Sequence, residues 1–478
     1  MTIGEDESMV TAKKSSSSVL KSALQKRPSI KERIAQGGGI RKEIPLATLG
    51  KFKVSSSRRD PIDIIIEQDK KRIPELIPIR HARMLTSPFA FLRGGAKIMI
   101  EDIGSATTSK IPVLANGDMH VSNFGIYATA ERNIVFSIND FDETHPGAWE
   151  WDLKRLTASA VVCSRFLGGD KVECEQAVRA IVSSYCKKME EYAHTPFVDL
   201  WYNTIKVEDV LKTLSACAKK EMNAIIRAAE KKTQLAMFEK MSHTVNQHRK
   251  IKSTGPLLTR ESQLESKKDT LKLLDGILQS YMASLTSDRS NLVNRYQILD
   301  IGRKVVGVGS VGTRCWVILM RGANDTDPLF LQVKEADNSV LAPYSHICLP
   351  YTNQGHRVVS GQRTVQGAPD IFLGWGDYEG TDFYVRQLSD IKGGAAFIPG
   401  KTQLSNFIEY CGTCGWALAL AHAKSGDAAM ITGYCGDGDE LDHALTKFAF
   451  LYADQTEKDY KALQIAAKLG KIQVAKEF

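Results

Sequence analysis

The chain contains two closely spaced motifs, GDMHVSNFG at residues 117–125 and FSINDFDE at residues 136–143. In the first motif, Asp118 and Asn123 are five positions apart on a predicted loop. A loop of this length can direct a carboxylate and an amide carbonyl into the same pocket. Because loops held on a rigid scaffold often carry functional residues, we expect both side chains to face a functional site.

The second motif follows a predicted strand at Ile134–Ile138. Asp140 and Asp142 come directly after this strand, where a carboxylate can be held rigidly. Carboxylate and amide oxygens suit Mg²⁺, which proteins bind through one or two carboxylates together with substrate phosphates. The two motifs therefore predict a magnesium site that includes Asn123, Asp140 and Asp142. Acidic loop residues that only cap helices are the alternative.

A glycine-rich stretch, VGVGSVG at residues 306–312, lies between two predicted strands and is followed by Lys334 on a further strand. Its position between strands, and not before a helix, argues against a dinucleotide-binding fold. The arrangement resembles the hairpin of protein kinases, in which glycine amides approach phosphate oxygens and a lysine neutralises their charge. A plain β-turn with a surface lysine is the alternative. The residues expected at a nucleotide are Gly307, Gly309, Ser310, Gly312 and Lys334.

Outside these motifs, the hydrophobic pattern divides the chain into helical and β-rich parts, and the predicted fold class is α+β. Residues 1–55 are rich in serine, lysine and glycine and are predicted to form a mobile basic tail. Residues 56–290 predict a helical catalytic lobe with a small β insert. Residues 291–395 predict a β-rich nucleotide-binding lobe, and residues 396–478 predict C-terminal helices that complete the catalytic lobe.

The composition is that of an ordinary globular protein, with 43% hydrophobic and 25% charged residues among 478. This excludes a mostly disordered chain, a collagen-like fibre and a coiled-coil rod. The formal net charge of +8 suits an anionic ligand such as a nucleotide and does not by itself favour nucleic acid. No stretch approaches the ~20 apolar residues that cross a bilayer, and the N-terminus has no apolar signal region. Because the nine cysteines fit reduced thiols, we expect a cytoplasmic protein without a membrane partner.

The first motif resembles the catalytic loop of aminoglycoside-phosphotransferase-like kinases, in which an aspartate accepts the hydroxyl proton and an asparagine five positions later holds Mg²⁺. By this resemblance, Asp140 matches the metal-binding aspartate, and residues 151–153 (Trp-Asp-Leu) match the structural aspartate that follows. The glycine hairpin and Lys334, however, come about 190 residues later, and the helix that normally precedes the catalytic loop is matched by residues 416–423. This order implies a circularly permuted, kinase-like fold of two lobes, with the helical catalytic lobe first, the β-rich nucleotide lobe second and helices last. Chain termini commonly lie close together, which makes such a permutation tolerable.

The chain from about residue 55 to residue 470 also resembles a bacterial family known only as a domain of unknown function, DUF2252. This resemblance rests on motifs that are spread through the sequence: Arg83-Met84, Ser87-Pro88-Phe89, Arg93-Gly94, the first motif, residues 139–143, Trp151–Leu156, Gln332–Ala336, Arg357–Val359 and Tyr452–Gln455. The family name records no activity, so function has to be inferred from the residues.

The motifs and the kinase resemblance together predict a phosphotransferase that depends on ATP and Mg²⁺. Asp118 is expected to act as the general base or to orient the substrate, and His120 to orient the substrate. Asn123 and Asp140 are expected to bind Mg²⁺, with Asp142 as a second acidic contact. The sequence does not identify the acceptor hydroxyl, which can belong to a small molecule or a protein, nor does it distinguish phosphoryl from nucleotidyl transfer. We expect no nucleic-acid partner.

The sequence leaves several alternatives open. Protein kinases pair the nucleotide lysine with a glutamate on a helix, whereas here Gln362, Glu335 or another group has to take that role. His120 can instead be a hydrogen-bonded loop histidine, and Arg93 is expected in an interdomain salt bridge although it could approach the site. The alternative functions are a non-catalytic nucleotide-binding protein, whose basic helices around Lys219–Lys252 contact a partner, and a metal-dependent phosphohydrolase.

Overall fold

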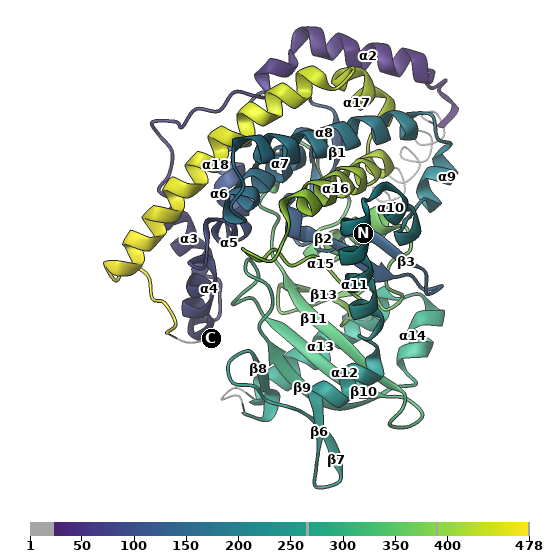
Figure 1. The fold of residues 1–478 in the computed structure, drawn as a ribbon. Helices are drawn as coiled ribbons and strands as arrows, with labels where there is room; N and C mark the ends of the chain where they lie inside the picture. The colour runs from purple at the N-terminus through teal and green to yellow at the C-terminus, as the bar shows by residue number, and fades with distance from the viewer. Residues whose placement is uncertain (1–22, 264–266, 389–390, 477–478) are drawn as a thin grey trace, which may run out of the picture.

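The computed structural model describes residues 23–263, 267–388 and 391–476. The predicted α+β class is confirmed: most of the helices gather at one end of the molecule, and a six-stranded sheet lies at the other (Figure 1). Within the described residues, no helix combines the length and the apolar character that are needed to cross a membrane.

The helical part is built around α7 (Trp149–Phe166), which is buried along nearly all of its length. α8 (Lys171–Ala193) and α18 (Asp439–Lys468) pack against α7, and α16 (Leu404–Ser425) packs along α8. Several charged side chains of α7 are buried with it. Because buried charges need partners inside the protein, α7 is a natural place for residues that position a site.

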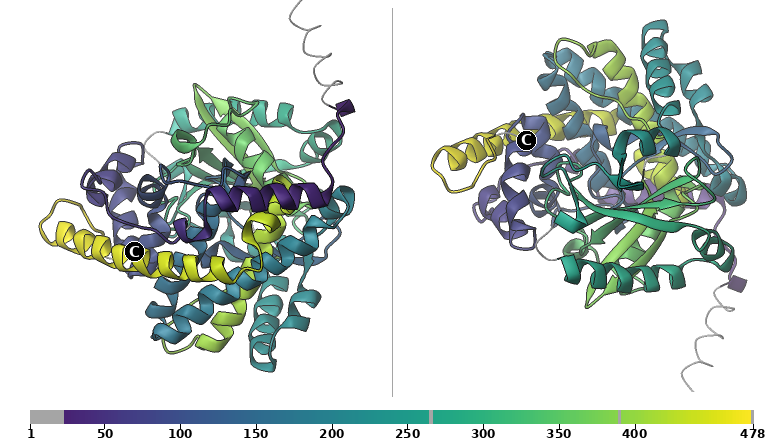
Figure 2. Two further views of the ribbon diagram at one scale, coloured as in Figure 1. Left: turned by 90° about the horizontal axis from the view of Figure 1, so that it is seen from above. Right: turned by 90° about the horizontal axis from the view of Figure 1, so that it is seen from below.

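The N-terminal helices cover one side of the helical part. They are α2 (Ile30–Glu43), α3 (Pro61–Asp69), α4 (Ile77–Met84), α5 (Pro88–Gly94) and α6 (Ala96–Ile103). The C-terminal end of the chain returns to them, since the Ala475 N–H donates to the Pro78 carbonyl at 3.0 Å and Leu463 of α18 packs in one cluster with Ile65 of α3 (Figure 2).

Helix α2 lies in the region that the sequence predicts as a mobile tail. It starts with a complete capping box and packs along α17 (Ala428–Cys435). A Cβ atom on Gly37 would lie 2.0 Å from the Met430 carbonyl oxygen, so this glycine serves close helix packing. The prediction of a mobile tail is therefore wrong for residues 30–43, and residues 1–22 lie outside the described part of the chain.

A small β insert interrupts the helical part, as predicted. β1 (Pro112–Ala115) pairs with β4 (His145–Ala148), and β2 (Phe124–Ala128) forms a hairpin with β3 (Ile134–Ile138), which β5 (Ile205–Lys206) extends. All of these pairs are antiparallel. The predicted strand at residues 134–138 is confirmed.

The six strands of the large sheet follow the order β12-β13-β11-β10-β9-β8, and every pair is antiparallel. Their bounds are β8 (Leu258–Arg260), β9 (Gln297–Lys304), β10 (Cys315–Arg321), β11 (Pro328–Ala336), β12 (Gly374–Tyr378) and β13 (Thr381–Gln387). Alternate residues of β10 face opposite sides: Ile318 packs in one cluster with α13 (Lys267–Ser284), and Val317 packs in another with α12 (Gln234–Met241). The β-rich part thus also draws on residues before 291.

Helix α15 (Gln354–Gln366) connects the two parts of the molecule. It packs against β12 and β13 of the large sheet and against α16 and β3 of the helical part. The remaining elements are α9 (Phe197–Tyr202), α10 (Val207–Thr213), α11 (Ala216–Glu230), the hairpin of β6 (Ser242–Val245) and β7 (His248–Ile251), and α14 (Ser287–Val293).

Candidate functional site

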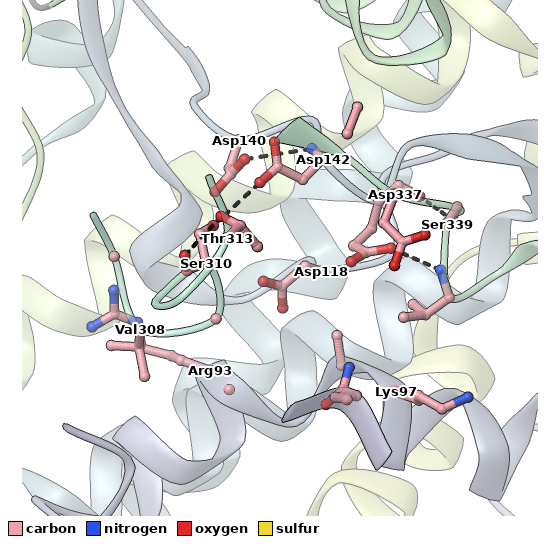
Figure 3. Close-up of a pocket in the computed structure, with 18 of the residues that line it drawn as sticks. Arg93, Lys97, Asp118, Asp140, Asp142, Val308, Ser310, Thr313, Asp337 and Ser339 are labelled. Carbon is pink, nitrogen blue, oxygen red and sulfur yellow. Dashed lines mark hydrogen bonds between the residues drawn. The ribbon is translucent and has the colours of Figure 1, made fainter. Parts of the chain in front are cut away.

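A pocket of about 480 Å³ contains residues from both acidic motifs, from the glycine-rich stretch and from the strand of Lys334 (Figure 3). One wall of the pocket comes from the N-terminal helices α3, α5 and α6 and from the segment after α3. The predicted site residues that line the pocket are Asp118, His120, Asn123, Asp140, Asp142, Gly307, Gly309, Ser310 and Lys334. Gly312 is the one predicted site residue that does not line it.

The strand register brings the two acidic motifs together. β1 and β4 pair so that the start of the first motif lies beside the end of the second. In the next hairpin, Phe124 is opposite Ile138, and the Asn139 N–H donates to the Asn123 carbonyl at 2.9 Å. The pairing of four short strands therefore explains why both motifs face one pocket.

Asp152, near the start of α7, holds the backbone at the start of the first motif. Its Oδ1 accepts a hydrogen bond from the Gly117 N–H at 2.8 Å, and its Oδ2 accepts one from the Asn116 N–H at 2.5 Å. Nε2 of His422 on α16 lies 3.3 Å from Oδ2, and the Tyr185 hydroxyl is 2.9 Å from the other ring nitrogen. Because hydrogen bonds to an ionised acceptor are strong, Asp152 fixes the loop from which Asp118 projects.

Asp118 points into the pocket with one oxygen engaged. Its Oδ1 accepts two hydrogen bonds from the guanidinium of Arg155 on α7, from Nε at 3.0 Å and from Nη2 at 2.5 Å. Its Oδ2 accepts no hydrogen bond from a described residue and lies 3.7 Å from Nε2 of His120. Arg155 therefore holds the carboxylate in place, and the second oxygen stays open to the pocket.

His120 lines the pocket beside Asp118 and is uncharged. Burial lowers the pKa of its imidazole to about 3, although the nearby charge of Asp118 acts in the opposite direction. Its Nδ1 has no hydrogen-bond partner among the described residues, and its ring packs against Phe89 with 6.4 Å between the centroids. A neutral imidazole in this place can donate or accept one hydrogen bond with a bound ligand.

The contact between Lys334 and Asp142 joins the β-rich side of the pocket to the side formed by the acidic motifs. The buried ammonium group of Lys334 on β11 forms an ion pair with Oδ2 of Asp142. The same carboxylate accepts hydrogen bonds from the Tyr384 hydroxyl at 2.7 Å and from the Ser310 hydroxyl at 3.2 Å. Burial acts to raise the pKa of Asp142, but the charge of Lys334 and the hydrogen bonds from Lys334 and Tyr384 lower it to about 2. Asp142 is therefore ionised at neutral pH.

Asp142 is thus the partner of Lys334 that the sequence left open. Glu335 pairs with Arg314 at 3.1 Å, and the side-chain amide of Gln362 donates to Gln366 at 2.9 Å. Both Lys334 and Glu335 line the pocket, but the Glu335 carboxylate is engaged by Arg314.

Asp140 and Asn123 are the residues that fit a metal ion. The Asp140 carboxylate accepts one long hydrogen bond, from the Asp142 N–H at 3.4 Å, and burial together with the charge of Asp142 raises its pKa. Asn123 directs its amide nitrogen to the Asp118 carbonyl at 3.0 Å, which leaves its amide oxygen for a ligand. A partly buried carboxylate with so few donors is stabilised by a cation.

A magnesium ion needs few ligands from the protein itself. In residues 23–263, 267–388 and 391–476, no three His, Cys, Asp or Glu side chains form a ready metal cluster. Mg²⁺ sites, however, use one or two carboxylates and take further oxygens from phosphate groups and water. Asp140 and Asn123 therefore suit a metal ion that enters together with a phosphate ligand.

The glycine-rich stretch forms the turn between β9 and β10. Gly307 and Gly312 have φ angles of 63° and 91°, which glycine adopts without strain. Gly307, Gly309 and Ser310 line the pocket. Gly312 lies at the base of the turn, where its carbonyl accepts a hydrogen bond from the Ile73 N–H at 2.8 Å.

Two arginines from the N-terminal part hold the carbonyl groups of this turn. Arg83 donates to the Gly307 carbonyl, and Arg72 donates to the Val311 carbonyl. The N–H groups of residues 308–310 donate to no described residue. Successive free amides in a turn form an anion-binding surface, so the turn can bind phosphate.

Residues 72–466 match the family described as "Uncharacterized protein conserved in bacteria (DUF2252)". The chain belongs to the DUF2252 family. The matched residues include both acidic motifs, the glycine turn and Lys334, so the whole pocket except for its edge at α3 lies in the DUF2252 region. No curated protein and no solved structure matches the chain.

Sequence reasoning missed some of the residues that build the site of this DUF2252 protein. Arg155 follows Asp152 by three positions on one helix, a spacing that places both on one face, and that spacing is the signal that could have identified it. The expected salt bridge of Arg93 is wrong: Arg93 lines the pocket and forms no ion pair with a described residue. Arg72 and Arg83 depend on contacts with the glycine turn that no local pattern encodes.

Proposed function

We propose that this DUF2252 protein is a kinase-like phosphotransferase that uses ATP and Mg²⁺ to phosphorylate a hydroxyl group. The proposal rests above all on the contact of the Asp142 carboxylate with both Lys334 and Ser310, which joins the acidic motif to the nucleotide motif across 192 residues. In protein kinases, a glycine-rich turn covers the phosphates, a strand lysine binds them, and an aspartate and an asparagine hold the metal. Groups of all four kinds line one pocket of this protein.

The packing of the helices supports a circularly permuted arrangement. His422 of α16 contacts Asp152 beside the first acidic motif, although 270 residues separate the two. In a kinase without permutation, the helix that corresponds to α16 would lead directly into that motif. The Ala475 N–H donates to the Pro78 carbonyl, so the segment after α18 approaches the beginning of the matched region 72–466, and such a close approach makes a permutation tolerable.

The proposed chemistry assigns a role to each group in the pocket. Asp118 receives the acceptor hydroxyl at Oδ2 and orients it for attack, while Arg155 holds the carboxylate in place. Neutral His120 donates or accepts a further hydrogen bond at the same hydroxyl. Asp140 and Asn123 would hold Mg²⁺, which neutralises phosphate charge when bound. Lys334 exchanges its contact with Asp142 for the phosphate oxygens of the nucleotide.

The test is thermal unfolding with ATP in the presence and absence of Mg²⁺. Wild type, Lys334→Ala and Asp140→Ala are compared with the control variants Lys71→Ala and Asp337→Ala, which remove an exposed lysine–aspartate pair at the edge of the same pocket. A ligand at a hundredfold excess over its dissociation constant adds about 2.7 kcal/mol of stability. We expect a Mg²⁺-dependent rise of Tm in wild type and in the controls, and none in Lys334→Ala or Asp140→Ala.

Two other outcomes would refute or change the proposed function. If millimolar ATP does not shift the Tm of wild type, the proposal is wrong. If ATP binds as expected but no phosphorylated product and no ADP form with any hydroxyl acceptor, the protein is a nucleotide-binding protein without catalysis.

A further inference from the structure

The wall of the pocket opposite the sheet carries four basic side chains, two from the segment after α3 and two from the helices α5 and α6. Three of them already have partners in the protein. Lys71 pairs with an aspartate at 2.8 Å, Lys97 pairs with a glutamate one turn along its helix at 3.1 Å, and Arg72 donates to a carbonyl of the glycine turn. The fourth, Arg93, differs from the others.

Arg93 forms no hydrogen bond and no ion pair with any described residue, and its Nε is buried without a partner. It ends α5 below the glycine turn, where a Cβ atom on Gly309 would lie 3.6 Å from the Arg93 carbonyl oxygen. Burial lowers the pKa of its guanidinium, and the charges of Asp118 and Asp140 oppose that effect. A half-buried cation without a partner is costly unless an anion meets it.

The position of Arg93 relative to Asp118 distinguishes two parts of the pocket. In Figure 3, Asp118 lies between the pair Asp140 and Asp142 on one side and the helices that carry Arg93 and Lys97 on the other. The acidic pair belongs to the part assigned to nucleotide and metal. Arg93 lies on the side of Asp118 away from the acidic pair and directly below the glycine turn, so an anionic group bound there belongs either to the acceptor or to the end of the nucleotide's phosphate chain, and the experiment below separates the two.

We propose that Arg93 binds a phosphate or carboxylate group of the acceptor, so that the acceptor is an anionic compound with a free hydroxyl. This inference rests on the proposed function, because it assigns the Asp140 side of the pocket to the nucleotide. The planar guanidinium presents several N–H donors that match two oxygens of such a group. Lys97 lines the same wall of the pocket but is paired with Glu101, so among the described residues Arg93 is the basic side chain of this wall that is left for an anion.

The experiment titrates inorganic phosphate as the probe and follows thermal unfolding. It is done on the protein alone and on the protein saturated with Mg²⁺ and a non-hydrolysable ATP analogue. Wild type, Arg93→Gln and Arg93→Lys are compared with Arg59→Gln, which removes an exposed arginine outside the pocket. We expect phosphate to bind wild type and Arg59→Gln equally with the analogue present, and Arg93→Gln about tenfold or more weakly, since hydrogen bonds to charged groups are strong. Arg93→Lys should give an intermediate affinity.

Binding of Mg²⁺ and the ATP analogue shows whether Arg93 serves the acceptor or the nucleotide. The Tm shift caused by Mg²⁺ and the analogue should be equal in wild type and Arg93→Gln. Unchanged phosphate affinity in Arg93→Gln would overturn the inference, and so would loss of its nucleotide shift, because Arg93 would then serve the nucleotide. If wild type binds no nucleotide, the proposed function fails, and the phosphate titration of the protein alone still shows whether Arg93 binds an anion.

Discussion

Replacement of Lys334 by methionine should lower the free energy of unfolding by about 3 kcal/mol, because removal of one partner of a buried ion pair leaves the other without compensation. The two side chains are 4% and 25% exposed. Asp142 keeps its hydrogen bonds from Tyr384 at 2.7 Å and Ser310 at 3.2 Å, so the cost should fall at the lower end of the range for buried pairs.

The pKa of Asp142 gives the pH dependence of the stability that its partners contribute together. Burial acts to raise it, but Lys334 and Tyr384 lower it from 3.8 to about 2, a change worth about 2.5 kcal/mol. Because the folded-state pKa is lowered, this stabilisation is complete above about pH 4 and is lost as the pH falls through 2. In Lys334→Met the pKa of Asp142 rises, so the loss of stability should begin at a higher pH.

The assay is urea unfolding at pH 7 of Lys334→Met, Asp142→Asn and the double variant. We expect the double variant to lose less stability than the sum of the single variants, with a coupling of about 2 kcal/mol. Lys71 and Asp337 form the matched control pair, since their side chains are 68% and 55% exposed and an exposed pair contributes at most about 1 kcal/mol. The reasoning is refuted if Lys334→Met costs no more than Lys71→Met, or if the two single effects simply add.

Three further predictions concern the first acidic motif and Asp152, which holds it in place. Asp152→Asn should lower the free energy of unfolding by about 2–4 kcal/mol, because a buried carboxylate that accepts two backbone hydrogen bonds is replaced; a cost below 1 kcal/mol in urea unfolding would contradict its positioning role. Asp118→Asn should reduce ATP-dependent transfer about 10²- to 10⁴-fold without changing the Tm shift caused by Mg²⁺ and ATP, and undiminished transfer would remove its assigned role. His120 has a folded-state pKa lowered by burial to about 3 from 6.5, so the unfolded state binds more protons between these values and wild type loses stability as the pH falls below 6.5. His120→Gln should therefore lose about 2 kcal/mol less than wild type between pH 7 and pH 5, and equal losses in urea unfolding would show that His120 is not buried in its neutral form.

The parts of the fold that depend on local pattern could be predicted. The strand at residues 134–138 has the predicted extent, because it is encoded by its run of apolar residues and by the polar residues at its ends. Helix α2 was not predicted, since the composition around Gly37 is also that of a flexible linker. Only the close approach of α17 shows that glycine is there for packing. The capping box at its start was visible in the sequence.

In the candidate site, too, local motifs could be predicted from the sequence, whereas contacts between distant parts of the chain could not. Motif spacing identified Asp118, Asn123 and Asp140 as pocket residues, because all three project from loops of one short β insert. The partner of Lys334 could not be predicted, since it depends on how the sheet meets the helical part 192 residues away. The unpaired state of Arg93 depends in the same way on which side chains its neighbours already engage.

The most direct test of the account is a crystal structure of the protein with Mg²⁺ and a non-hydrolysable ATP analogue. The account predicts phosphate oxygens at the amides of residues 308–310, a metal ion bound by Asp140 and Asn123, and Lys334 moved from Asp142 to the phosphates. A nucleotide bound outside this pocket, or an intact pair of Lys334 and Asp142 with no phosphate at the glycine turn, would contradict it.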